Sequence, residues 1–567
     1  MNRAQTAVRL VNQQMKSDIF VYFREGSYFF SNTIQFTVDD GAFNGHTIHY
    51  ASYPNEQAVL HGGIQVTNWT PISGTSLWSA DLPDNVKDAR QVYINGERMT
   101  PTNTAAGFPG SVSLTATGYV VRDPLPSFFG PNQCASDIEL LFTGVGSTWT
   151  ESRLRVQAVD HSSDGSTVIT MQEPGFTLGR QKFPGQNLTY PSSVSNLFSF
   201  LGSNTPGQYY LNTAQHKIYY VPRPQDDMKT AVVIVPSTEV LIEMQGQRSP
   251  SYTRPVRGIS FERISFQYAG WLQPNTGVGY VDMQSGFRRV PGTTIEPHTW
   301  VPVPGNLRFH TVESITILGC TFEHLGATAI QVDDSSQNVT VQNCTFSDIS
   351  CGGVYVGQVD DVNVTSPERV NGFFSVDNNF FNGIPVEYHD CAVILGGYVV
   401  GTHITHNSIL NNANTGISLG WGWSVEQAQN AGNNVITSNY VYGSNWLLED
   451  GGSIYALGPQ FNSTMARNYI STQRKLFGAL YTDEGSAYWH ITHNVVNNCP
   501  SWLHIWTASI HDEVVDFCWT NQAYMDVHGT RITISNITYI TPGLPFPKEA
   551  QDIIDQSGVD WMFGPKP

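Results

Sequence analysis

From about residue 310 onward the sequence repeats itself, with a period near two dozen residues. Each repeat ends in a short apolar strand, and these strands read "GGVYVG", "CAVILGG", "TGISLGW", "GGSIYALG", "GALYTDEG" and "SWLHIW". Their inward residues are separated by 24, 26 and 23 positions, from Val393 to Ile417, Ile454 to Leu480, and Leu480 to Leu503. Three short strands in such a period predict a parallel β-helix, whose coils cover their apolar faces only by stacking.

An asparagine precedes the second apolar strand in many of these repeats. We expect the side-chain amides to form an internal ladder at one corner, each amide bonding to the neighbouring coil. Ordinary turn-forming asparagine is the alternative interpretation. The positions concerned are Asn343, Asn379, Asn407, Asn439, Asn468 and Asn494.

The remaining chain is consistent with an all-β protein. Charged residues make up only 13% of it, against 12% aromatics and 51 glycines, a composition that favours strands over helices. Residues 1–64 are predicted to form an N-terminal capping helix and the first coils. Residues 65–250 lack the repeat and predict an inserted β-sandwich-like domain, 251–545 the main β-helix with the active site, and 546–567 a C-terminal helix and tail.

Bulk charge and cysteine usage exclude several function classes. The net charge of −18 disfavours nucleic acid and anionic membranes as partners. The sequence contains no run of 18 apolar residues, which is the length needed to span a bilayer. Seven cysteines without C-x-x-C spacing argue against zinc, so we expect neither a metal nor a cofactor. One or two disulfides are possible. Cys320, Cys344 and Cys351 fall in repeat positions, where they could instead be small core residues.

Several motifs along the chain resemble one enzyme group. In order they are "YASYPNEQAVLHGG", "RQVYINGERM", "PGQYYLNTAQHKIYYVP", "STEVLIEMQG", "TGISLGWGW", "EDGGSIYALGPQ" and "YTDEGS". Together they resemble secreted right-handed parallel β-helix glycoside hydrolases of family 141, and more distantly family 120, over roughly residues 7–560. Fucosidases and xylanases both occur in family 141, so the resemblance implies hydrolysis of a glycosidic bond in a plant- or microbe-derived saccharide, without fixing the sugar.

We expect the protein to be secreted and glycosylated. No secretory signal is visible at Met1, so either the protein is cytosolic or a signal has been removed, and we favour the second. N-x-Ser/Thr sequons, which mark glycosylation sites in secreted proteins, occur at seven asparagines. These are Asn68, Asn187, Asn338, Asn343, Asn363, Asn462 and Asn536.

Two related stretches, "LLEDGGSIYALG" and "GALYTDEGS", carry the candidate catalytic acids. Aligning their apolar-Tyr pairs puts Asp450 and Asp483 on adjacent coils, near one edge of one solvent-facing sheet. Glycoside hydrolysis requires such a pair, one carboxyl group protonating the leaving oxygen and the other attacking or activating water. We predict Asp450 and Asp483 as the pair, with Glu484 in reserve for either role. Corner capping by these carboxylates is the alternative.

Aromatic and polar residues near these acids are predicted to bind the saccharide. Seven of the 13 tryptophans lie between residues 421 and 519, and aromatic rings stack on the apolar faces of sugar rings. In "GWGW", Gly420 and Gly422 lack side chains, which we expect to leave room for a ligand. The predicted substrate-binding residues are Trp421, Trp423, Tyr455, Tyr481, His504, Trp506, Tyr280 and Gln284.

Two other functions fit the same pattern. A polysaccharide lyase would need a basic residue beside a uronic acid, for which Arg474 and Lys475 are candidates, and acidic stretches at 332–334 and 359–361 could hold calcium. A non-catalytic carbohydrate-binding scaffold would follow if the acids were buried in corner hydrogen bonds. The sequence leaves open the sugar, exo or endo action, stereochemistry and oligomeric state.

Overall fold

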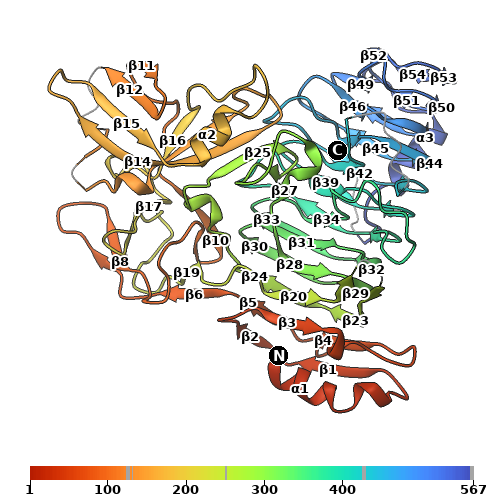
Figure 1. Cartoon of the computed structure of the whole chain (residues 1–567), viewed down its shortest axis with the longest axis horizontal. Coiled ribbons are helices and arrows are strands. Elements are labelled where there is room, and N and C mark those ends of the chain that lie inside the picture. Colours follow the sequence, from red (N-terminus) through yellow and green to blue (C-terminus); the bar gives the residue numbers. More distant parts are fainter. Residues whose placement is uncertain (123–127, 131, 250–251, 424–429, 562–567) are drawn as a thin grey trace.

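A computed structural model describes residues 1–122, 128–130, 132–249, 252–423 and 430–561. The chain folds as a right-handed parallel β-helix with three long sheets, confirming the predicted fold class (Figure 1). An all-β insertion projects from one side of the solenoid (Figure 1). Helix α1 (Asn2–Arg9) lies at the N-terminal end, and α3 (Lys548–Gln556) packs on Tyr440 and Tyr469 near the other end.

The coils of the solenoid contribute one strand to each of three sheets, except the last described coil, which adds β53 and β54 to the first two sheets only. Sheet 1 contains, in order, β1 (Ile19–Phe23), β4 (Ile48–Ser52), β23 (Val256–Glu262), β29 (Val312–Leu318), β32 (Gln337–Gln342), β35 (Ser375–Asp377), β38 (His403–Thr405), β41 (Val435–Thr437), β44 (Pro459–Ala466), β47 (Ala487–Thr492), β50 (Val514–Asp516) and β53 (Thr533–Ser535). Sheet 2 contains β2 (Gly26–Phe29), β5 (Ala58–His61), β24 (Ile264–Gln267), β30 (Thr321–Leu325), β33 (Thr345–Ile349), β36 (Phe380–Asn382), β39 (Ser408–Leu410), β42 (Tyr440–Tyr442), β45 (Tyr469–Ser471), β48 (Val495–Asn497), β51 (Trp519–Thr520) and β54 (Thr538–Tyr539). Sheet 3 contains β3 (Ile34–Thr37), β20 (Ile242–Gln245), β28 (Gly305–His310), β31 (Thr328–Asp333), β34 (Val354–Val356), β37 (Ile394–Gly396), β40 (Ile417–Leu419), β43 (Ile454–Ala456), β46 (Gly478–Thr482), β49 (Ser501–Ile505) and β52 (Met525–Val527).

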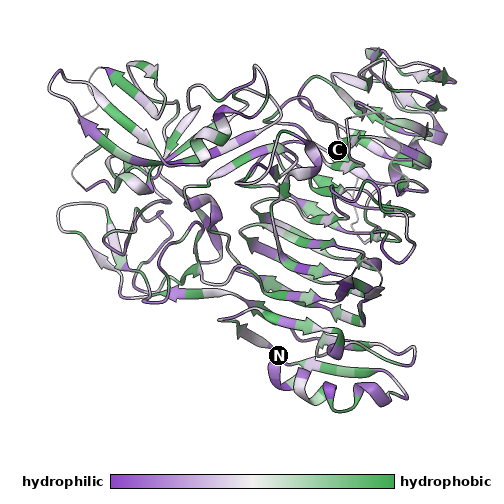
Figure 2. Ribbon diagram, in the orientation of Figure 1, coloured by the Kyte–Doolittle hydropathy of each residue, from purple (hydrophilic) through white to green (hydrophobic). Residues whose placement is uncertain are grey.

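The core runs along the inside of the solenoid. Apolar and polar residues alternate along many of its strands, so that one side chain in two points inward (Figure 2). On sheet 3, Ile454, Leu480 and Leu503 are fully buried and paired in register, as predicted. The predicted register is one residue off at β37, where Ile394 rather than Val393 pairs with Ile417. Both side chains are buried. In a continuous apolar run the sequence therefore does not show which of the two residues pairs with Ile417 of the next coil.

The asparagine ladder is present at five of its six predicted positions. Between successive coils the side-chain Nδ2 donates to the next Oδ1 over 2.9–3.0 Å, along the series Asn379, Asn407, Asn439, Asn468 and Asn494. The prediction for Asn343 is wrong, because its side chain is exposed and the ladder position on that coil belongs to Cys344, whose N–H donates to Asn379. Cys320 and Cys344 are buried free thiols, so they are small core residues.

The insertion consists of two sheets with separate cores. The first contains β6 (Gly63–Val66), β19 (Val233–Pro236), β9 (Val92–Ile94), β10 (Glu97–Pro101), β17 (Gln208–Asn212), β18 (Lys217–Tyr220), β8 (Trp78–Asp81) and β7 (Thr70–Pro71). The second contains β11 (Ser111–Leu114), β12 (Gly118–Arg122), β15 (Thr167–Met171), β14 (Glu151–His161), β13 (Glu139–Thr143), β16 (Ser193–Ser195), β25 (Tyr280–Gln284), β26 (Phe287–Arg288) and β27 (Val301–Pro302). A short helix, α2 (Gly175–Arg180), packs beside it, and a hairpin forms from β21 (Gln247–Ser249) and β22 (Tyr252–Arg254).

Two strands pair across the domain boundaries that the sequence predicted for the insertion. Strand β20, inside the range 65–250, pairs with β3 and β28 in the solenoid. Strand β25, inside the range 251–545, pairs with β14 of the insertion. Because pairing partners lie far apart in the sequence, repeat spacing alone does not locate these exchanges.

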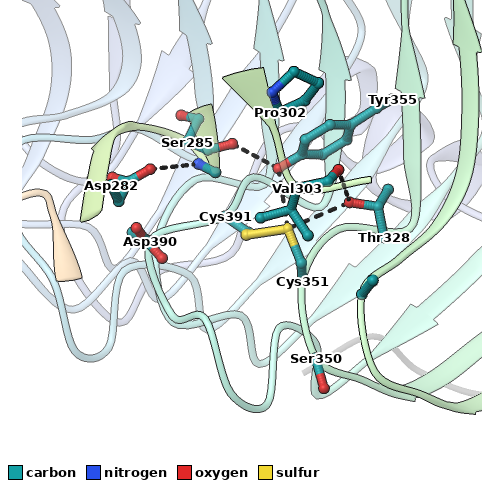
Figure 3. Close-up of a disulfide and its surroundings, with 12 residues drawn as sticks. Asp282, Ser285, Pro302, Val303, Thr328, Ser350, Cys351, Tyr355, Asp390 and Cys391 are labelled. Carbon is teal, nitrogen blue, oxygen red and sulfur yellow. Dashed lines mark hydrogen bonds between the residues drawn. A yellow bond between two sulfur atoms is a disulfide. The ribbon is translucent and has the colours of Figure 1, made fainter. Parts of the chain in front are cut away.

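A disulfide ties the solenoid together where the segment from β25 to β27 docks on sheet 3. Cys351 bonds to Cys391, and the Tyr355 hydroxyl donates to the Ser285 carbonyl over 2.6 Å (Figure 3). The Gly286 N–H donates to Asp282 Oδ1 over 2.9 Å, which fixes the turn between β25 and β26. None of the helices in the described ranges is both long and apolar enough to cross a membrane.

Candidate active site

Sheet 3 carries the predicted acids at the edges of two adjacent strands. Asp450 lies in the turn before β43, with a left-handed φ of 55°, and Asp483 follows directly after β46. Two glycines after Asp450 permit this tight corner, since a Cβ at Gly451 would lie 2.6 Å from Asn414 Oδ1. Pairing of β43 with β46 therefore brings two acids 33 positions apart in sequence onto neighbouring coils.

Two tyrosines hold these acids in a crossed arrangement. Tyr455 and Tyr481 point outward from the paired strands, with ring centroids 5.0 Å apart and planes at 87°. The Tyr481 hydroxyl donates to Asp450 Oδ1 over 3.0 Å, and the Tyr455 hydroxyl donates to Asp483 Oδ2. Each tyrosine thus orients the carboxylate carried by the neighbouring coil.

Burial sets the protonation of the three acids. It raises the pKa of Asp483 to about 7, assisted by the nearby charges of Asp450 and Glu484, although the Tyr455 hydrogen bond opposes it. Burial likewise raises the pKa of Asp450 and of Glu484. Among the described residues, no lysine, arginine or histidine forms an ion pair with any of the three. The site therefore holds three acids with no cation to offset their charge.

All three acids line one cavity of about 390 Å³ between sheet 3 and the insertion. Aromatic side chains dominate its walls, and few polar groups besides the acids reach it. The other lining residues are Trp149, Phe183, Pro184, Gln186, Met283, Gln284, Ile295, Pro297, Trp300, Trp423, Tyr455, Tyr481 and Trp506.

Five of the eight predicted substrate-binding residues line this cavity: Trp423, Tyr455, Tyr481, Trp506 and Gln284. Trp506 is the most open of them, with 42% of its surface exposed. Gln284 Nε2 lies 3.4 Å from the Tyr455 hydroxyl, so it belongs to the same hydrogen-bonded group.

The other three predicted residues lie behind the walls of the cavity. Tyr280 is fully buried and donates to Asp390 over 2.7 Å. Trp421 is buried against Trp300 and Trp423. His504 packs edge-on against Tyr481, and burial lowers its pKa to about 4, which keeps the ring neutral at pH 7.

The glycines of "GWGW" serve backbone packing rather than ligand space. A Cβ at Gly420 would lie 2.0 Å from the Leu457 carbonyl oxygen, and one at Gly422 would lie 2.9 Å from the Tyr398 hydroxyl. Both residues also have φ near 95°, where glycine is favoured. The expectation that they open space for a ligand is wrong, because neighbouring coils fill that space.

Sequence reasoning missed the half of the cavity that does not belong to the solenoid. Trp149, Phe183 and Gln186 come from the insertion, and Met283 and Trp300 come from the segment containing β25 to β27. The Trp149 Nε1–H donates to the Met283 carbonyl over 3.0 Å, which joins these two parts. All of these residues except Met283, which lies in β25, belong to irregular segments outside the repeat. Of the cavity residues outside the solenoid, only Gln284 was predicted from the sequence.

Comparisons with known proteins agree with this architecture. The family model for the right-handed β-helix region matches residues 303–367. A solved structure described as a glycoside hydrolase is 21% identical, with a TM-score of 0.79, covering 99% of this chain and 94% of its own. The structure of XylC with xylose is 10% identical, with a TM-score of 0.50, covering 94% of this chain and 82% of its own. The search of curated proteins gives no match.

Proposed function

We propose that the protein is a glycoside hydrolase that cleaves an oligo- or polysaccharide between Asp450 and Asp483. The observation that carries this proposal is a pair of tyrosine-bonded carboxyl groups, the buried Asp483 and the half-buried Asp450, on adjacent coils of one aromatic-walled cavity. Aromatic rings suit the apolar faces of sugars, while the acids suit the scissile oxygen and the anomeric centre. The family 141 resemblance of the motifs around both acids points the same way.

The two acids are proposed to have different roles. Asp483, whose pKa is raised to about 7, is suited to hold a proton and donate it to the leaving glycosidic oxygen. Asp450, bonded by Tyr481, is then the carboxylate that attacks the anomeric carbon or activates a water molecule. Water completes the reaction, adding a hydroxyl to the anomeric carbon and returning a proton to the site. Glu484 is the reserve for either role.

A lyase fits the cavity less well. Proton abstraction beside a uronic acid calls for a base, yet no lysine or arginine is among the described residues that line this cavity. Lys475 instead lies 3.3 Å from Glu449. Of the acidic stretches considered for calcium, Asp333 pairs with His310 and Asp334 pairs with Arg248. These contacts favour hydrolysis over elimination.

The proposal is tested by digesting a glycan panel with the wild type, Asp450→Asn and Asp483→Asn, measuring new reducing ends and absorbance near 235 nm. We expect reducing ends without absorbance, and a loss of about 10²–10⁴ in kcat for each variant. Asp516→Asn, on the outer face of sheet 1, is the matched control and should keep full activity. Full activity of both site variants would refute the assignment. Unsaturated products would identify a lyase, and binding without any product a scaffold.

We also propose that the protein works outside the cell. The Cys351–Cys391 disulfide supports this, because such bonds persist mainly in oxidising compartments. The seven sequon asparagines are all exposed, as glycan attachment requires. Mass determination of the protein from its native source, before and after glycosidase and reductant treatment, tests both modifications.

A further inference from the structure

A second cavity of about 360 Å³ lies on the same outer face of sheet 3, nearer the N-terminal end. Its floor is formed by the outward residues of β28, β31 and β34, where Arg308, Gln331 and Tyr355 are paired in register. Its wall is the segment around Trp300, which also borders the first cavity. Tyr355 and Tyr455 are three strands apart, about 14 Å at 4.8 Å per strand, so the two cavities are separate sites.

Arg308 brings a positive charge to this cavity and forms no ion pair within the described part of the chain, although Glu243 lies beside it on β20. Its Nε donates to the Gly305 carbonyl over 3.0 Å, but within the described part of the chain neither Nη has a hydrogen-bond or ion-pair partner. Burial lowers the pKa of Arg308, and the charges of Glu243, Glu239 and Asp333 oppose this shift. A guanidinium held in this way has two parallel donors available for a carboxylate.

Neither of the acids that line the cavity, Asp333 and Asp360, forms an ion pair with Arg308 in the described structure. Asp333 is already bonded to His310 and accepts a hydrogen bond from Gln331 Nε2 over 2.7 Å. Burial lowers the pKa of His310, but the hydrogen bond and charge of Asp333 outweigh it, so the net shift of the pKa is upward. Asp360 is the remaining acid, and its side chain is exposed at the surface.

The cavity also has features that fit a sugar ring better than a simple anion. Trp300, Phe287 and Tyr355 supply aromatic surface, the last two lying parallel with centroids 6.3 Å apart. The Oε1 atom of Gln358 is buried without a hydrogen-bond partner and can accept from a hydroxyl group. An arginine fork, an aromatic wall and an orphan acceptor together match a carboxylate-bearing saccharide unit.

We propose that this second cavity binds an acidic saccharide unit, with its carboxylate on Arg308, its ring near Trp300 and a hydroxyl group donating to Gln358. Binding there needs no turnover at Asp450 and Asp483. This inference can therefore be tested independently of the proposed hydrolase activity. It makes the cavity an anchoring site for acidic side groups or residues of a glycan.

Calorimetric titration with methyl β-D-glucuronide, methyl β-D-glucoside and inorganic phosphate tests the proposal on the full chain. We expect the wild type and Asp483→Asn to bind the glucuronide with equal affinity, and to bind the glucoside and phosphate at least tenfold more weakly. Arg308→Gln should lose at least tenfold in glucuronide affinity. Arg257→Gln is the matched control, because Arg257 is exposed on sheet 1 and pairs with Glu313 over 2.8 Å.

Several results would overturn the proposal. Absence of glucuronide binding, or equal binding by Arg308→Gln, removes the assigned role of Arg308. Loss of binding in Asp483→Asn places the ligand in the first cavity instead, and phosphate binding as tight as the glucuronide reduces the site to a general anion site. If Arg308→Gln fails to fold, Arg308→Lys and Gln358→Leu replace it, and each should weaken glucuronide binding.

Discussion

At the scale of single residues, the site depends on how tyrosine hydroxyls tune buried acids. Tyr455 and Tyr481 are themselves buried, so each directs its hydroxyl group at a carboxylate rather than at water. A phenol that donates to a carboxylate stabilises the ionised form and lowers its pKa. The pKa of Asp483 near 7 is therefore a balance between burial, which raises it, and the Tyr455 hydrogen bond, which lowers it.

Tyr455→Phe tests this balance through the pH dependence of kcat/KM. Removing the donor should raise the pKa of Asp483 further, so the proton needed by the leaving group persists to higher pH. The alkaline limb of the profile should then move upward by about one pH unit. Tyr442→Phe, on sheet 2 and away from the cavity, should leave the profile unchanged. An unmoved alkaline limb, or one shifted to lower pH, would show that Asp483 is not the proton donor.

At the scale of elements, the repeat decides most of the architecture and the register of the site. A single outward column along sheet 3 joins Arg308, Gln331, Tyr355, Leu395, Ser418, Tyr455, Tyr481 and His504, each paired with the next. Both cavities open on this column. The spacing of coils therefore determines which side chains become neighbours, whatever their separation in the sequence.

Asn439→Ala tests the contribution of the asparagine ladder to this register. The Asn439 amide donates to Asn468, and its oxygen accepts from the side chain and the backbone N–H of Asn407. Its loss leaves buried donors unpaired, at a cost of about 2–4 kcal/mol in the free energy of unfolding. Chemical denaturation followed by circular dichroism measures this cost. Asn343→Gly, at an exposed position with positive φ, should cost little, and equal losses in both variants would contradict the ladder.

Periodicity made the solenoid, the two acids and the cavity residues Tyr455, Tyr481 and Trp506 predictable from the sequence, whereas Trp423 came from the "GWGW" motif and Gln284 from a stretch outside the repeat. It failed where local composition hides the register, as at Val393 and Ile394 within a continuous apolar run. It also failed at Asn343, because an asparagine in a left-handed turn beside the ladder looks like a ladder residue. Burial behind other rings removed Trp421 and Tyr280 from the cavity, and alternation along a strand does not reveal what later packs on its outer face.

At the scale of the whole molecule, the active-site cavity exists because the insertion docks on the solenoid. Arg90 of the insertion lies 2.6 Å from Glu139 and 2.5 Å from Glu387, which follows β36 on the solenoid. Arg98 pairs with Asp348 of β33 in the same interface. The pairs Arg90–Glu387 and Arg98–Asp348 link segments that are more than 200 positions apart, which is why the sequence alone did not predict the insertion-borne wall of Trp149 and Phe183.

Arg90→Met tests whether docking shapes the cavity. The change removes the shortest ion pair of Glu139 and of Glu387, which keep longer ion pairs with Arg153 and Arg98. This loss should destabilise the docked insertion by about 1.5–3 kcal/mol. Because the proposed catalytic acids stay on sheet 3, we expect KM to rise more than kcat falls, together with faster limited proteolysis of the insertion. Arg223→Met is the control, since Arg223 pairs with Glu97 and Asp226 inside the insertion. An unchanged KM in Arg90→Met would separate docking from substrate binding.

The most direct measurement is a crystal structure of Asp483→Asn with the oligosaccharide that the wild type cleaves. A scissile glycosidic oxygen within hydrogen-bond distance of residue 483, with the anomeric carbon facing Asp450, is the predicted result. An oligosaccharide whose scissile bond lies outside this cavity, or whose anomeric carbon faces neither acid, would contradict the account.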